Sequence, residues 1–243
     1  MRADQRSVEI DPELAGQAAR ALKEAGFAAQ VVTGDGAAGW LTGGIPYDRL
    51  HATCAVRDIP HAWTVQVRPG GTIACPYAPG FGYGHILRLH VLPGGAAVGR
   101  FAGSADYMML RSQRPAPGPV RRWVDAGGSI RESATMLDPR LLERAPAAAD
   151  LMIAALVPGV VTRMYEADDD SGECTYWLLD AAGPGGPWAS VDYQPGSSFE
   201  VQQAGDRNLW DEAEAAYFRW LGAGHPGISR FGLSMTPGTA PLA

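Results

Sequence analysis

The chain has few cysteines, and each of them stands alone. Cys54, Cys75 and Cys174 are its three cysteines. None of them belongs to a Cys-x-x-Cys pair or has a nearby histidine pair at ligand spacing. Zinc sites usually need such pairs. The sequence therefore predicts no metal site and favours buried, reduced thiols.

Long apolar runs are also absent. The most apolar stretch, residues 147–161, contains Asp150, Pro158 and Gly159, and no run approaches the roughly 20 residues that span a membrane. This stretch is typical of a buried helix and its end. The N-terminus lacks the charged and then apolar order of a secretory signal, so we expect a cytoplasmic protein.

Basic residues are also fewer than acidic ones, 20 against 26. The formal net charge is -6 over 243 residues. Proteins that mainly bind nucleic-acid phosphates carry a basic surface, so this balance argues against nucleic acid as the main partner. The hydrophobic content of 46% is enough to bury a sizeable core in one or two domains.

What the chain does contain is a strand that runs into a polar, glycine-rich turn. Residues Val31 to Trp40 have this pattern, with Asp35 in the turn. Glycine lets a ligand approach the backbone amides, and the Asp35 carboxylate can accept hydrogen bonds from an amino or hydroxyl group. The alternative is that Asp35 simply caps a following helix.

The preceding stretch predicts a strand and then a helix. Asp11 is a good N-cap, Pro12 suits the first helical position, and the helical spacing of apolar residues ends at Gly26. Glu9 thereby falls at the carboxyl end of its strand. Ligands of open α/β sheets bind along that edge, where an acidic residue commonly takes ribose hydroxyls. We therefore expect Glu9 and Asp35 to face one crevice.

A third strand, a loop and a short helix follow. The strand begins near Tyr47, the helix spans roughly His61 to Gln66, and the turn Arg68 to Gly71 opens the next strand. This order of motifs resembles the protein-L-isoaspartate O-methyltransferases, which are class I methyltransferases that use S-adenosylmethionine. The resemblance covers about the first third of the chain and rests on Val8-Glu9-Ile10, Gly34-Asp35-Gly36, Gly39-Trp40, Pro46-Tyr47-Asp48, Ile59-Pro60 and Arg68-Pro69-Gly70-Gly71.

The resemblance implies an α/β fold with a Rossmann-like sheet. It also implies methyl transfer from S-adenosylmethionine to an isoaspartyl or aspartyl carboxyl group of a protein or peptide. The cofactor-binding residues would be Glu9, which holds the ribose hydroxyls, and the turn Gly34, Asp35 and Gly36. Within that turn, Asp35 and the Gly36 amide would form hydrogen bonds with the adenine.

The resemblance also implies an acceptor side. The loop from Ala52 to Ala55, which includes Thr53, would line the methyl-transfer pocket. Arg57 and His61 would steer the acceptor carboxylate, although His61 could equally be the first residue of the short helix. A carboxylate acceptor is already ionised near neutral pH, so no general base is required.

One part of the family pattern is missing. In the family, a strand and a turn of the kind Glu-x-Gly-x-Gly-x-Gly precede the acidic strand and cradle the methionine part of the cofactor. Here only Met1 to Arg6 precede Ser7, which is too short for a strand, a glycine loop and a crossover helix. We therefore expect an N-terminally incomplete sheet that binds S-adenosylmethionine weakly or not at all.

Two other functions stay open. A non-catalytic binding module that has lost the cofactor would keep its partner without the chemistry. A tRNA or small-molecule methyltransferase would share the first two motifs with the isoaspartate enzymes.

The middle of the chain predicts a hairpin and a linker. Ile86 to Val91 and Ala97 to Phe101 alternate like strands around a Pro-Gly-Gly turn. Asp106 to Arg111 continues as an apolar stretch whose methionines we expect in the core. Ser112 to Arg122 is rich in proline, arginine and glycine, which is typical of a linker. We therefore expect domains at residues 1–111 and 123–243.

The second half predicts an α+β accessory domain. It faintly resembles the C-terminal extension of some actinobacterial isoaspartate-methyltransferase-like enzymes, which implies binding of a peptide substrate. The acidic run Asp168 to Glu173 does not have the spacing of a calcium loop, so we expect a solvated hairpin turn. The expected elements are a helix at about 139–156, strands near 160–165, 175–179, 188–193 and 199–203, and a helix at 209–221 whose aromatic stripe faces the core.

Overall fold

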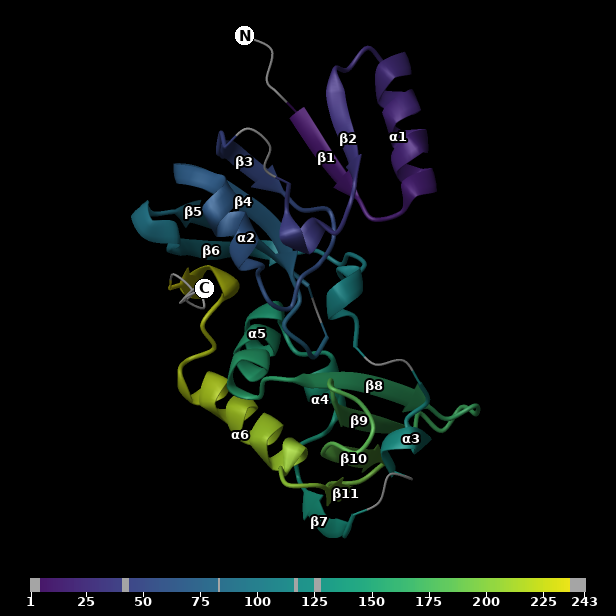
Figure 1. The fold of residues 1–243 in the computed structure, drawn as a ribbon. Coiled ribbons are helices and arrows are strands. Elements are labelled where there is room, and N and C mark those ends of the chain that lie inside the picture. The colour runs from purple at the N-terminus through teal and green to yellow at the C-terminus, as the bar shows by residue number, and fades with distance from the viewer. Residues whose placement is uncertain (1–4, 41–43, 83, 116–117, 125–127, 237–243) are drawn as a thin grey trace.

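The fold is mixed α/β, as predicted. The computed structural model describes residues 5–40, 44–82, 84–115, 118–124 and 128–236. These residues form one two-stranded sheet and two five-stranded sheets, which follow one another along the molecule in Figure 1. No described helix is long and apolar enough to cross a membrane.

The first unit is a parallel strand, helix, strand motif. β1 (Gln5–Glu9) pairs in parallel with β2 (Ala29–Thr33), and α1 (Pro12–Glu24) connects them. Asp11 caps α1 as predicted, because its carboxylate accepts hydrogen bonds from the amides of Glu13 and Leu14. The next sheet follows through the 3-10 turn η1 (Gly36–Ala38).

The first five-stranded sheet has the order β12-β6-β5-β4-β3. The β3–β4 pair is parallel and the others are antiparallel. The predicted hairpin is present as β5 and β6, and every second residue of β5 is buried. The elements are β3 (Tyr47–His51), α2 (His61–Gln66), β4 (Val67–Tyr77), β5 (His85–Val91), η2 (Pro93–Gly95), β6 (Ala97–Ser104) and β12 (Gly232–Met235).

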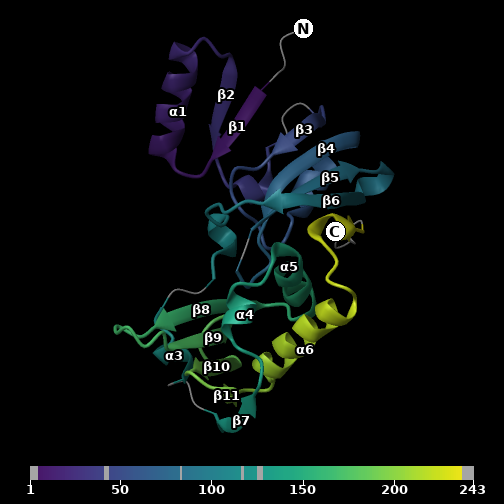
Figure 2. The same ribbon diagram turned by 180° about the vertical axis from the view of Figure 1, so that it is seen from behind.

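Strands β1 and β3 lie side by side but do not pair. Both views of the ribbon place them next to each other (Figures 1 and 2), and among the described residues no strand ladder joins their sheets. Side chains make the contact instead: Nη1 of Arg6 on β1 lies 3.5 Å from the hydroxyl of Tyr47 on β3. Each sheet thus ends at an edge that faces the other.

The first unit buries little of its own surface. Ala15 is the only described residue from 5 to 33 that is fully buried. Leu14 of the predicted apolar helix face is 50% exposed, and Phe27 is 59% exposed.

The second half forms an antiparallel sheet covered by helices, the predicted α+β arrangement. Its strand order is β7-β11-β10-β9-β8, and the aromatic stripe of α6 packs into its core as expected. The elements are α3 (Arg121–Val124), β7 (Arg131–Thr135), α4 (Arg140–Glu143), α5 (Ala147–Leu156), β8 (Val160–Glu166), β9 (Cys174–Asp180), β10 (Trp188–Tyr193), β11 (Phe199–Ala204), α6 (Leu209–Gly222) and η4 (Ile228–Arg230).

Two details of the sequence-based interpretation were wrong. The single helix expected at residues 139–156 is two helices, because Pro146 stands at the N-cap of α5 and cannot continue α4. Met108, expected in the core, is 79% exposed. Strands β7 and β12 were not predicted.

The chain crosses the predicted domain boundary twice. After α6 the chain returns to the first half, where β12 pairs with β6. Helix α5 contributes Leu151 to the core of the first half and Ile153 to that of the second. The division at residues 112–122 stays a prediction, and it separates two parts that share a sheet and a helix.

The segment expected as a linker is anchored at both ends. It begins in the 3-10 turn η3 (Arg111–Gln113), and Oε1 of Gln113 accepts hydrogen bonds from the amides of Arg57 and Asp58 at 2.7 and 3.0 Å. It ends in α3, where Trp123 is buried and its indole donates to the carbonyl of Asp180 at 3.1 Å. Ala116 and Pro117 lie outside the described residues.

A buried contact between a histidine and an aspartate connects the two halves. Nε2 of His85 on β5 lies 3.2 Å from Oδ2 of Asp150 on α5, and both side chains are almost completely buried. The other oxygen of Asp150 accepts a hydrogen bond from the amide of Gly82 at 2.7 Å. A carboxylate in such a site needs these partners, because an unpaired buried charge is costly.

Candidate cofactor site

Glu9 and Asp35 stand at the carboxyl ends of neighbouring parallel strands. Glu9 is the last residue of β1, and Asp35 follows β2 by two residues. The amide of Gly34 donates to the carbonyl of Glu9 at 2.9 Å, which continues the strand pairing up to the turn. The two carboxylates therefore lie at the same edge of the two-stranded sheet.

The half-buried thiol of Cys54 is close to both carboxylates. Burial is the main cause that raises the pKa of Cys54, and the negative charges of Asp35 and Glu9 raise it further. Cys54 belongs to the loop after β3. The thiol of Cys54 thus experiences the negative charge of both carboxylates.

Each carboxylate uses one oxygen to support its own turn. Oδ1 of Asp35 accepts from the amide of Ala37 at 2.9 Å and caps η1. Oε1 of Glu9 accepts from the amide of Asp11 at 3.0 Å. Within the described part of the chain, no hydrogen bond engages the second oxygen of Asp35 or of Glu9. Capping and ligand binding are therefore compatible at both residues.

Helix α2 fixes the glycine-rich turn. The indole of Trp63 donates to the carbonyl of Gly36, and the amide side chain of Gln66 donates to the carbonyl of Ala38, each at 2.8 Å. Gly39 has a φ of 63°, and a Cβ there would overlap the Gln66 side chain. These contacts hold the turn in one conformation.

The predicted acceptor-side residues are spread more widely. Thr53 is exposed in the loop next to Cys54. The backbone amide of Arg57 is bonded to Gln113. The ring of His61 lies against the β5–β6 turn, with Cε1 at 4.0 Å from the Cβ position of Gly95. The described contacts of Arg57 and His61 lead away from Glu9 and Asp35, and their steering role stays a prediction.

The site fits one half of S-adenosylmethionine. The free oxygens of Glu9 and Asp35 and the amides of the turn match the hydroxyl and amino groups of an adenosine. The cofactor-binding role of these residues stays a prediction.

Sequence reasoning identified the carboxylates and missed their supports. Trp63, Gln66 and Gln113 hold the turn and the loop through contacts across 27 to 56 residues of sequence. A buried indole in so short a helix needs a hydrogen-bond partner, and that requirement was the only available signal for Trp63.

A family comparison locates the resemblance. The family model described as protein-L-isoaspartate(D-aspartate) O-methyltransferase matches residues 2–88, which include β1 through most of β5. The resemblance that the sequence motifs predict is confirmed over this range.

Individual relatives match the same part. A protein-L-isoaspartate O-methyltransferase 1 of Anaeromyxobacter sp. (strain Fw109-5) is 46% identical over 78 residues, which are 30% of this chain and 36% of the relative. One of Hyperthermus butylicus is 42% identical over 72 residues, 29% of this chain and 30% of the relative. The chain thus spans about a third of the length of the curated relatives it matches.

Solved structures give a looser similarity. One described as a protein-L-isoaspartate O-methyltransferase has a TM-score of 0.44 and 18% identity, over 94% of this chain and 63% of that chain. A putative enzyme of the same name from Plasmodium falciparum, in complex with S-adenosyl-L-homocysteine, has a TM-score of 0.37 and 8% identity, over 44% of this chain and 51% of that chain.

Proposed function

We propose that this chain carries the adenosine-binding part of an S-adenosylmethionine-dependent O-methyltransferase. The proposed acceptor is an isoaspartyl or aspartyl carboxyl group of a protein or peptide. The observation that carries the proposal is the placement of Glu9 and Asp35 at the carboxyl ends of neighbouring parallel strands, inside the residues that match the isoaspartate methyltransferase family.

The proposed roles follow from the free atoms of the site. Glu9 accepts hydrogen bonds from the ribose hydroxyls, while Asp35 and the Gly36 amide address the adenine; Gly34 lets the base approach. The cofactor supplies an activated methyl group. Thr53 borders the acceptor pocket, and Arg57 and His61 attract the acceptor carboxylate. Since that carboxylate is already ionised, the protein contributes mainly position.

Catalysis requires the edges of β1 and β3 to be joined. A strand added in parallel between them would pair with both sheets and could lead into a glycine-rich loop for the methionine end. The unpaired edges also favour the second function, a binding module that keeps the fold and a partner without methyl transfer.

Calorimetry with adenosine and S-adenosylmethionine tests the proposal on this chain. Because the proposed partners Glu9, Asp35 and Gly36 all suit the adenosine part, we expect the two compounds to bind with similar, weak affinity. Glu9→Gln should weaken both about tenfold, since it removes the charge that accepts the ribose hydroxyls. Glu13→Gln on α1 is the matched control, because the Glu13 carboxylate lies outside the site and bonds Gln17.

A second protein tests the transfer itself. It would join a strand and a Glu-x-Gly-x-Gly-x-Gly loop, with a connecting helix, ahead of Gln5. We expect this protein to bind S-adenosylmethionine more tightly than adenosine and to methylate an isoaspartyl peptide. If neither protein binds either compound, the methyltransferase proposal is wrong and the binding module is the better function.

A further inference from the structure

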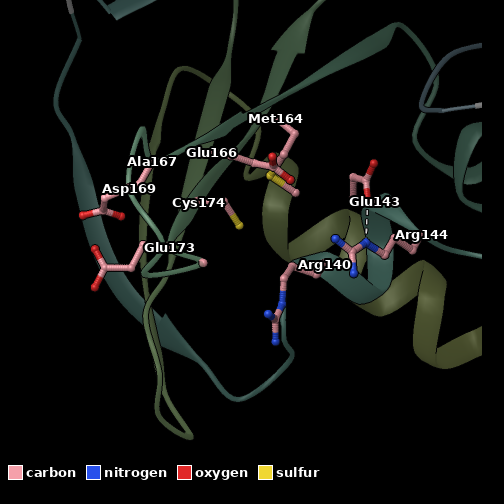
Figure 3. A pocket seen from close by; sticks show the side chains of 10 residues that line it. Arg140, Glu143, Arg144, Met164, Glu166, Ala167, Asp169, Glu173 and Cys174 are labelled. Atoms are coloured by element: carbon pink, nitrogen blue, oxygen red, sulfur yellow. Dashed lines mark ion pairs between the residues drawn. The ribbon is translucent and has the colours of Figure 1, made fainter.

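The second half contains a cavity that the proposed cofactor site does not use. It has a volume of about 380 Å³ and lies between α4, the end of β8 and the turn into β9. Figure 3 shows α4 with its arginines on one side and the β8–β9 turn on the other. The lining residues are Arg140, Glu143, Arg144, Met164, Glu166, Ala167, Asp169, Gly172, Glu173 and Cys174.

The floor of the cavity is apolar and polarisable. Met164 and Ala167 line it, and the Cys174 sulfur lies between the two walls in Figure 3. Cys174 is only 8% exposed, and its thiol has no hydrogen bond to another described residue. Burial raises the pKa of this thiol, so it stays protonated and neutral. Such a floor suits an aliphatic chain.

Both arginines of the cavity are already matched by carboxylates. Nη2 of Arg140 lies 2.6 Å from Oδ2 of Asp138, and its guanidinium stacks over the Tyr193 ring at 3.4 Å. Nε of Arg144 lies 3.3 Å from Oε2 of Glu143. The positive wall therefore brings little net charge to the cavity.

The opposite wall carries acids without cationic partners. Glu166, Asp169 and Glu173 make no ion pair with any described residue. Asp169 accepts only a hydrogen bond from the amide of Ser171 at 3.0 Å. Among the described residues no group of three acids, histidines or cysteines has the geometry of a metal site. The acidic run predicted as a solvated turn thus borders a cavity with unneutralised negative charge.

We propose that this cavity binds a lysine or arginine side chain of a peptide or protein partner. The aliphatic stem lies on Met164 and Cys174, and the cationic end lies at Glu166, Asp169 and Glu173. The volume admits one such side chain with some water. This site takes a cation, whereas the proposed methyl acceptor is a carboxyl group, so the two proposals stand or fall separately.

Fluorescence anisotropy of labelled peptides tests the site on the full chain. The probe is a short, capped Gly/Ala peptide with one central lysine, and the comparison peptide has norleucine at that place. We expect the lysine peptide to bind at least about tenfold more tightly, and added salt to weaken it, because the contact is ionic. Equal binding of the two peptides would overturn the proposal.

Variants locate the binding in the cavity. Glu166→Gln should weaken the lysine peptide about tenfold, and Ala167→Trp should abolish binding by filling the space. Asp168→Asn is the matched control, because it removes one charge from the same run without lining the cavity; its effect should stay below about twofold. Circular dichroism would check that each variant is folded.

Two results would contradict the proposal. An equal loss in Asp168→Asn and Glu166→Gln would mean general attraction to an acidic surface. Binding of spermidine at Glu166, with no binding of the lysine peptide, would mean that the site takes a free polyamine instead.

Discussion

At the scale of single residues, Cys54 reports on the proposed site. Its pKa is raised first by burial and then by the charges of Asp35 and Glu9. Cys75 is more deeply buried, and its pKa is raised to about 12. Since the thiolate is the reactive form, iodoacetamide near neutral pH should modify Cys54 well before Cys75.

Glu9→Gln should speed that modification. Removing a negative charge beside the thiol lowers its pKa, so at a pH below that pKa the thiolate fraction rises. We expect a rate increase of about twofold or more at a pH of about 8, measured by mass spectrometry. Glu13→Gln should leave the rate unchanged. No change in the Glu9 variant would mean that Glu9 does not lie near Cys54.

Asp150 is the residue on which the contact between the two halves depends most. Asp150→Ala would leave buried His85 and the Gly82 amide without their acceptor. We expect urea unfolding to show a loss of about 1 to 3 kcal/mol, because buried polar groups would lose a hydrogen-bond partner. Asp168→Ala, on the exposed turn, should change stability by less than about 0.5 kcal/mol. A small loss in the Asp150 variant would mean that water replaces the carboxylate.

The sequence identified the residues whose chemistry is local. Asp11 and Asp35 were recognised because a carboxylate before a helix or in a glycine-rich turn has few roles. Asp150 was noticed only as a charge in an apolar stretch. Its partner His85 lies 65 residues away, and no local pattern connects them.

At the scale of elements, the glycine-rich turn is rigid because α2 leaves no room beside Gly39. Gly39→Ala would place a methyl group against Gln66 at a positive φ. We expect a loss of about 1 to 2 kcal/mol in unfolding free energy and weaker adenosine binding. Gly222→Ala is the control, since nothing lies within 4 Å of its Cβ position and alanine favours a helix. It should not lower stability.

Element prediction succeeded where periodicity was strong and failed where the partner was distant. The alternation in β5 and the aromatic stripe of α6 each indicated the correct type and burial. β12 has only four residues and forms by pairing with β6, more than 130 residues earlier in the chain. Because edge strands gain their structure from such partners, a short segment carries little signal of its own.

At the scale of the whole molecule, cleavage of the linker should not separate the halves. Arg121 and Arg122 are exposed at the end of the segment, so trypsin should cut there. The β6–β12 pairing and α5 cross the cut. We therefore expect two fragments on a denaturing gel that elute together in gel filtration. Separate elution in native buffer would mean that the two halves fold independently.

The edges of β1 and β3 also bear on self-association of the molecule. An unpaired parallel edge is a template for any extended chain, and proteins often protect such edges with an inward-pointing charge. Arg6 has this place, since its guanidinium reaches from β1 to Tyr47. A second copy would bring the same positive charge to the same place, and the two would repel. We therefore expect Arg6 to disfavour pairing of two copies along these edges and to favour a strand that brings an acidic residue to the same level.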